Sequence, residues 1–180
     1  MNKILMVLAS LILSTQALAA VVISPGVSYS TNKAEATQPN ATQSESAQTV
    51  IDARLGYVLP MGLYLGGMYS LITMDDGTDK NSGNLIGPSV GYYSMMGFYS
   101  IFTYHILGEL DLDSTTKLTG AKGPQVDVGW VFPLSAYFAI GPQMTYRSVE
   151  FDKIEGTGTS IDTDYKFTGI EPYVTLWFMF

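Results

Sequence analysis

The sequence predicts an all-β protein, an eight-stranded antiparallel up-and-down β-barrel that follows a cleaved signal peptide. Three observations predict this fold. Segments of about ten residues alternate apolar with small or polar side chains, and the connections between them are alternately short and long. The composition is also rich in residues that favour β structure and turns, with 18 Gly, 12 Tyr and 8 Phe. We expect one barrel domain, residues 20–180, behind a leader, residues 1–19.

The leader has the layout of a secretory signal peptide. Lys3 supplies a positive start, residues 4–13 are apolar except for Ser10, and Ala17-Leu18-Ala19 is a small-x-small cleavage sequence. The apolar run is shorter than the ~20 residues of a spanning helix, which disfavours an N-terminal membrane anchor. The chain contains no Cys, so a disulfide-stapled domain and a lipoprotein are both excluded.

Eight segments carry the strand pattern, and their connections differ in length by position. The predicted strands are residues 21–30, 49–59, 62–73, 84–94, 98–107, 123–132, 136–149 and 165–180. The tight turns are residues 60–62, 95–97 and 133–135, and the long loops are residues 31–48, 74–83, 108–122 and 150–164. Outer-membrane barrels are built with short periplasmic turns and long extracellular loops, so this sorting favours a transmembrane β-barrel.

Most of the 16 acidic residues fall in or beside the long loops, and only Asp52, Asp127 and Glu171 lie inside predicted strands. We therefore expect four mobile, acidic surface loops that can meet a surface ligand. The formal net charge of -7 argues against a nucleic-acid partner. Residues 74–79 loosely resemble a calcium loop but lack its spacing and closing Glu, so neither a metal site nor a cofactor is predicted.

Each strand has one continuously apolar face and one small, polar or charged face. In the last strand Ile170, Val174 and Leu176 share one parity, whereas Glu171 and Thr175 share the other. A membrane barrel turns the apolar face to lipid; a soluble barrel would turn the same face to a core. The leader, the sorted loops and two belts of aromatic residues near the turns and the long loops favour the membrane barrel.

The chain ends Tyr173-Val-Thr-Leu-Trp-Phe-Met-Phe180, with the pattern carried by Tyr173, Leu176, Phe178 and Phe180. This ending resembles the C-terminal signature of outer-membrane barrels, and the mature chain resembles the small eight-stranded family of OmpX and the OmpA membrane domain. The resemblance implies a monomer in the bacterial outer membrane, in contact with membrane lipid and lipopolysaccharide. It further implies long loops outside, both mature termini in the periplasm, and recognition of the last strand by the barrel-assembly machinery.

The lumen of an eight-stranded barrel is just wide enough for side chains to fill. The predicted polar lumen residues are Asp52, Arg54, Gln125, Asp127, Gln143, Arg147, Glu171 and Tyr173. Counting from the tight turns puts Arg54 and Asp127 at one height on opposite sides, and it puts Arg147 beside Glu171. Because unpaired buried charges are costly, we expect a plugged lumen and a structural or surface-interaction role. A narrow channel for ions or small solutes is the alternative.

Two further features bear on function and fold. Some barrels of this size modify lipid A with a His, a Ser and an acid; here His105 is followed by Leu107 where a deacylase-like site has Ser, so we expect no enzyme. A soluble lipocalin carries Gly-x-Trp near its first strand, and residues 25–29 contain no Trp. Proline removes a ladder donor, so bulges are expected at five prolines. These are Pro25, Pro88, Pro124, Pro142 and Pro172.

Overall fold

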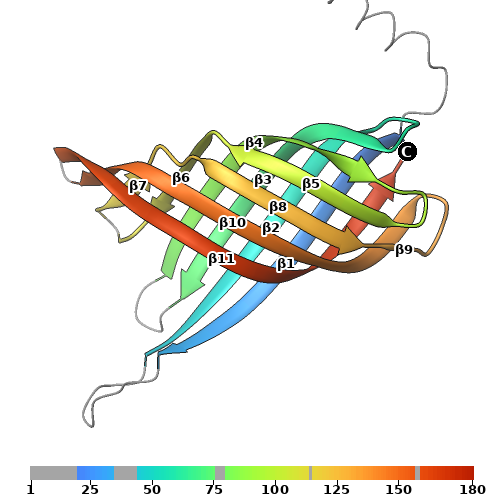
Figure 1. The fold of residues 1–180 in the computed structure, drawn as a ribbon. Coiled ribbons are helices and arrows are strands. Elements are labelled where there is room, and N and C mark those ends of the chain that lie inside the picture. The colour runs from blue at the N-terminus through green and yellow to red at the C-terminus, as the bar shows by residue number, and fades with distance from the viewer. Residues whose placement is uncertain (1–19, 35–43, 76–79, 114, 157–158) are drawn as a thin grey trace, which may run out of the picture.

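The protein is a closed antiparallel β-sheet with long strand extensions at one end (Figure 1). A computed structural model describes residues 20–34, 44–75, 80–113, 115–156 and 159–180. Within these ranges eleven strands are present. They are β1 Ala20–Ala34, β2 Ser44–Val58, β3 Leu63–Asp75, β4 Lys80–Tyr93, β5 Phe98–His105, β6 Leu107–Asp111, β7 Lys117–Thr119, β8 Gly123–Trp130, β9 Phe132–Pro133, β10 Phe138–Gly156 and β11 Thr159–Met179. The expected signal peptide lies outside the described residues.

Eight of these strands make the ring, in the order β11, β1, β2, β3, β4, β5, β8, β10, and β10 pairs with β11 to close it. The ring corresponds to the eight predicted segments. The other three strands are short: β6 follows β5 along β4, while β7 and β9 flank β8 along β10. The sequence did not predict them as separate strands.

The tight turns form where they were expected, and glycine is required at two of them. Gly62 and Gly97 have φ of 84° and 89°, a backbone conformation that other residues adopt only with strain. A Cβ atom on Gly97 would stand 2.0 Å from the carbonyl oxygen of Val131. The turn between β4 and β5 therefore fits closely against the neighbouring strand.

The prediction of long loops is largely wrong, because the strands continue into them. β1 and β2 stay paired out to Ala34↔Ser44, and β10 and β11 out to Gly156↔Thr159. Backbone hydrogen bonds between strands do not require apolar side chains at every second position. The polar extensions lack this alternation, so the sequence pattern did not predict them as strands. Residues 35–43, 76–79, 114 and 157–158, the centres of the predicted loops, lie outside the described residues.

The predicted bulges at the prolines are mostly wrong. Pro25 and Pro88 pair with Ala53 and Gly67 in continuous register. Beside Pro88, the bulge lies on the neighbouring chain segment and not on β4 itself. Ser89 pairs with Thr103 and Ile86 pairs with Leu107, so the segment that joins β5 to β6 has one residue more than β4 over this stretch.

At Pro142 the ladder between strands is interrupted, without a bulge. The β8–β10 pairing stops at Gln143↔Gly129 and resumes with β9 at Ile140↔Phe132, and Pro142 lies in the gap. Because proline has no N–H to donate, a backbone hydrogen bond between the strands cannot form from this residue. A register shift also occurs within β10–β11, between Phe151 and Lys153, away from any proline.

The β1–β11 pairing covers only the turn end of the barrel. It runs from Val22↔Met179 to Val27↔Val174. Beyond that point, among the described residues, β1 continues beside β2 and β11 beside β10 with no pairing between them. Figure 1 shows the β1–β2 hairpin leaving the wall at an angle to β10 and β11. We call this unpaired boundary the β1–β11 seam.

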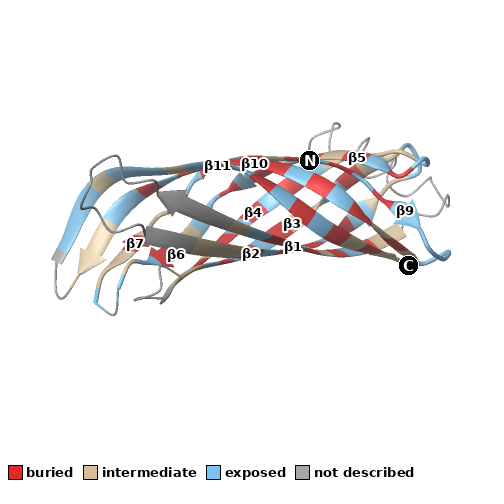
Figure 2. Ribbon diagram, turned by 90° about the horizontal axis from the view of Figure 1, so that it is seen from below, coloured by how far each residue is buried: buried red, intermediate tan, exposed pale blue. Residues whose placement is uncertain are grey.

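Buried and exposed residues alternate along the strands, which Figure 2 shows as a checkered wall. Inward residues are buried and outward residues are exposed, as the period of two requires. The described residues contain no helix long and apolar enough to cross a membrane.

Candidate functional site

The middle of the lumen holds a buried network of charges. The Nη2 atom of Arg54, on β2, lies 2.8 Å from Oδ2 of Asp127, on β8, and both side chains are fully buried. These strands are four places apart in a ring of eight, so the pair crosses the lumen. The structure thus contains the contact that counting from the turns predicted.

Arg147 organises a second group of charges. Its Nη2 atom donates to Oδ1 of Asp52 over 3.1 Å and to the hydroxyl of Tyr173 over 3.1 Å. Its Nη1 atom lies 3.6 Å from Oε2 of Glu171. The Tyr173 hydroxyl donates in turn to Glu171 over 3.0 Å. Arg147 therefore holds two carboxylates from two different strands.

Gln125 joins the two groups. Its amide nitrogen donates to Oδ1 of Asp127 over 2.9 Å and to Oδ2 of Asp52 over 3.3 Å. Its amide oxygen accepts from Nε of Arg147 over 2.8 Å and is 3.0 Å from Nε2 of His105. A carbonyl oxygen only accepts, so His105 carries its proton on Nε2 in this network.

Gln143 plays a similar part on the Arg54 side. Its oxygen accepts from Nη1 of Arg54 over 3.1 Å and from the hydroxyl of Tyr99 over 2.8 Å. Its nitrogen donates to Asp127 over 3.2 Å and to Thr145 over 2.7 Å. The eight predicted lumen residues therefore lie in one network. Its two arginines balance two of its three carboxylates.

The sequence analysis missed four polar members of this network: Gln48, Tyr99, His105 and Thr145. Thr145 donates to Asp127 over 2.7 Å and is fully buried. Its parity, shared with Gln143 and Arg147, was a signal that could have found it. His105 shares the inward parity of Tyr99 and Thr103, but apolar Ile101 at the same parity keeps that face of the strand from reading as polar.

An aromatic layer closes the lumen at the turn end. Trp177 is fully buried and its ring lies 4.8 Å from that of Tyr99, 4.9 Å from that of Tyr93 and 6.4 Å from that of Tyr64. Aromatic pairs at these separations add to the stability that burial gives. Tyr64 and Trp177 lie near the turn end in the sequence, which predicts that they belong to the aromatic belt there. This prediction is wrong, because both side chains point inward and are fully buried.

An apolar layer fills the opposite end, where a polar lumen was expected. Its buried members come from the strand extensions as well as from the ring: Val50, Ile72, Leu85, Leu110, Leu118, Ala121, Val149, Phe151 and Tyr173. Met74, Leu112, Ile154 and Phe167 pack against this layer. The polar network therefore lies between two layers of buried, mostly apolar side chains.

One side-chain bond crosses the inner side of the β1–β11 seam. Gln48, on β2, donates to Oε1 of Glu171, on β11, over 2.8 Å. The inward residues of β1 at this level are small, since Ser30 pairs with Gln48 and the next inward residue, Ser28, is buried. Gln48 can therefore reach past β1 and seal the lumen from within.

The outer wall is apolar. Leu55, Ile170 and Val174 are each more than half exposed there, whereas Asp52, Arg54, Asp127, Arg147 and Glu171 are all buried. Exposed aromatic residues near the tight turns include Tyr57, Tyr92, Trp130, Phe132 and Phe180, and those near the extensions include Tyr29, Tyr69, Tyr104 and Tyr146. A wall of this kind is the surface a lipid-facing barrel presents.

The residues of the C-terminal pattern divide between the two faces. Phe180 is 66% exposed, and the Phe178 ring lies 5.1 Å from that of Phe138 on the wall. Tyr173 instead is buried among Arg147 and Glu171. Tyr173 points into the lumen because it has the opposite parity to the other three residues. Of the C-terminal pattern, Leu176, Phe178 and Phe180 are therefore the residues on the outer face, where a binding partner could contact them.

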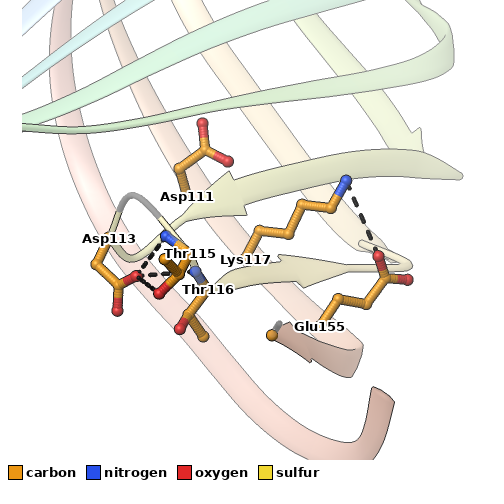
Figure 3. Close-up of a pocket in the computed structure, with 7 residues that line it drawn as sticks. Asp111, Asp113, Thr115, Thr116, Lys117 and Glu155 are labelled. Carbon is orange, nitrogen blue, oxygen red and sulfur yellow. Dashed lines mark hydrogen bonds and ion pairs between the residues drawn. The ribbon is translucent and has the colours of Figure 1, made fainter. Parts of the chain in front are cut away.

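A hollow of about 260 Å³ lies at the tip of the extensions (Figure 3). Asp113 accepts from the backbone N–H groups of Thr115 and Thr116, over 2.7 and 2.8 Å. These bonds favour the ionised carboxyl and lower the pKa of Asp113 from its ordinary value. Lys117 lies 3.9 Å from Glu155 and 3.5 Å from Glu109. The acids are engaged in turn and strand contacts, which gives the hollow a structural role.

Comparison with known proteins gives the fold. No family model matches the chain, and no curated protein matches it. Among solved structures, neisserial surface protein A is similar with a TM-score of 0.54 and 12% identity, covering 89% of this chain and 97% of that one. Outer membrane protein AlkL, solved in lipid bilayers, aligns with a TM-score of 0.45 and 10% identity over 93% of each chain. The first likeness establishes the fold: an antiparallel β-barrel built like neisserial surface protein A.

Proposed function

We propose that the protein is an integral barrel of the bacterial outer membrane, with a plugged lumen and a structural or surface-interaction role. The observation that carries the proposal is the filled lumen inside an apolar wall. An aromatic layer, a neutralised charge network and an apolar layer follow one another along the axis. The two ends of the ring differ, with tight turns at one and long paired extensions at the other.

The proposed orientation puts the extensions outside the cell and both mature termini in the periplasm, after removal of residues 1–19. Short turns at the periplasmic end are the general rule for these barrels. The aromatic rings near both ends would lie at the two membrane interfaces, in contact with phospholipid and lipopolysaccharide. The barrel-assembly machinery would read the outward face of the last strand, with Leu176, Phe178 and Phe180.

The channel alternative is disfavoured by the charge pairs. Ions would need water between Arg54 and Asp127, which are 2.8 Å apart and fully buried. Separating a buried ion pair is costly, and most side chains in the layers above and below it are apolar or aromatic. Planar-bilayer recording tests this point: we expect no steady conductance from the refolded protein, and a stable open state would contradict a plugged lumen.

Catalysis is not proposed. His105 is fully buried and bonded to Gln125, away from the apolar wall where a lipid would arrive. Mass spectra of lipid A from cells with and without the protein test this directly. We expect identical spectra, and a new acylation state that depends on His105 would contradict a structural role.

A further inference from the structure

The β1–β11 seam leaves two strand edges without partners. β1 pairs with β11 up to Val27↔Val174, yet β1 extends to Ala34 and β11 begins at Thr159. Along this stretch the described backbone of each strand is paired on one side only. Unpaired edges present rows of N–H and C=O groups that can add another strand.

The two edges are complementary to each other. β1 and β11 run antiparallel and already pair in a continuous register at the turn end. The pairing within one chain stops at Val27↔Val174, two residues before Pro172, which lacks an N–H to donate to a ladder with either chain. The free edges of β1 and β11 run in opposite directions. A twofold axis can therefore pair β1 of each copy with β11 of the other in antiparallel fashion.

Exposed apolar side chains flank the seam. Ile170 is 70% exposed and Tyr29 is 64% exposed, more than any other large apolar side chain of the described strands. Continuing the register would bring Tyr29 opposite Pro172, two residues from Ile170 on the same face of β11. The lumen does not need these side chains as a cover, because Gln48 and Glu171 close the seam from inside.

We propose that two copies of the chain associate at this seam, with the outer part of β1 in each pairing with the outer part of β11 in the other. The pairing would satisfy both edges and cover Tyr29 and Ile170. The inference rests on the proposed membrane barrel, since an axis along the membrane normal relates the two copies. It differs from the expectation of a monomer, and the experiment below decides between the two.

Crosslinking between single-cysteine chains tests the proposal, because the native chain has no Cys. Tyr29→Cys and Ile170→Cys are made in separate chains, one carrying a size tag, then refolded together in detergent and treated with a short bismaleimide. A product between the tagged and untagged chains cannot arise within one chain. The matched control mixes Ile170→Cys with Val90→Cys, since Val90 is 44% exposed on β4, opposite β11 in the ring.

We expect the Tyr29–Ile170 mixture to give a linked dimer and the Val90 control about tenfold less, because pairing raises the local concentration of the two thiols. Equal yields in both mixtures, or no linked product, would overturn the proposal. Heat-modifiable mobility of each variant on gels is recorded in parallel. A folded barrel that fails to link overturns the dimer alone, whereas loss of heat modifiability contradicts the membrane barrel itself.

Discussion

Arg54 and Asp127 form a 2.8 Å ion pair that joins β2 to β8 through the middle of the lumen. Removing one partner leaves the other charge buried without compensation. We expect Arg54→Met to lower the free energy of unfolding by ~3–5 kcal/mol. Urea titration in detergent, followed by tryptophan fluorescence, measures the loss.

The double variant Arg54→Met with Asp127→Leu is the control for this pair. It removes both charges and keeps apolar volume, so much of the lost stability should return. If the double variant were as unstable as the sum of two single changes, the pair would not be the source of the coupling.

Gln125 is the second position where the lumen network can be tested. Gln125→Leu removes the acceptor for Arg147 and His105 and the donor to Asp127 and Asp52. Buried groups left without partners cost ~1–3 kcal/mol each, so a loss of at least that size is expected in the same urea titration. A variant with unchanged stability would show that the network can rearrange around the missing amide.

Gly97 tests the fit of a tight turn. Gly97→Ala forces a Cβ against the carbonyl oxygen of Val131 at a positive φ, and we expect a loss of ~1–3 kcal/mol. Gly156→Ala is the matched control, because a Cβ there meets nothing within 4 Å. Equal stability of the two variants would contradict the close fit.

The contacts of Asp113 with Thr115 and Thr116 should respond to acid. The pKa of Asp113 is lower in the folded turn than its ordinary value, so its stabilising effect is complete above that ordinary value and is lost as the pH falls through the lowered one. NMR titration of the Thr115 and Thr116 amides should follow this loss. Asp113→Asn keeps an acceptor but not the charge, and should flatten the titration; an unchanged profile would assign it to another group.

The strand period and the tight turns were enough to predict the polar half of the site. Asp52, Arg54, Asp127 and Arg147 share an inward parity because side chains alternate along a strand, and heights counted from the turns matched Arg54 with Asp127. No longer-range information was needed for these contacts.

The remaining part depends on pairing between strands, which the alternation does not specify. Leu118 and Phe151 fall in segments that read as loops, yet strand extension makes them part of an apolar layer. The bulge at Ile106 reverses parity after His105, and it exists only as a mismatch between β4 and its neighbours. The β1–β11 seam is likewise a relation between the two ends of the chain.

The direction in which the apolar faces point is the central claim, and the two tryptophans report it. Trp130 is 44% exposed on the wall and Trp177 is fully buried in the lumen. In bilayers with brominated acyl chains, the Trp177→Phe variant, which keeps Trp130, should be strongly quenched, and the Trp130→Phe variant, which keeps Trp177, should not. Strong quenching of Trp177 with none of Trp130, or a protein that stays dissolved and monodisperse without any amphiphile, would contradict a lipid-facing wall.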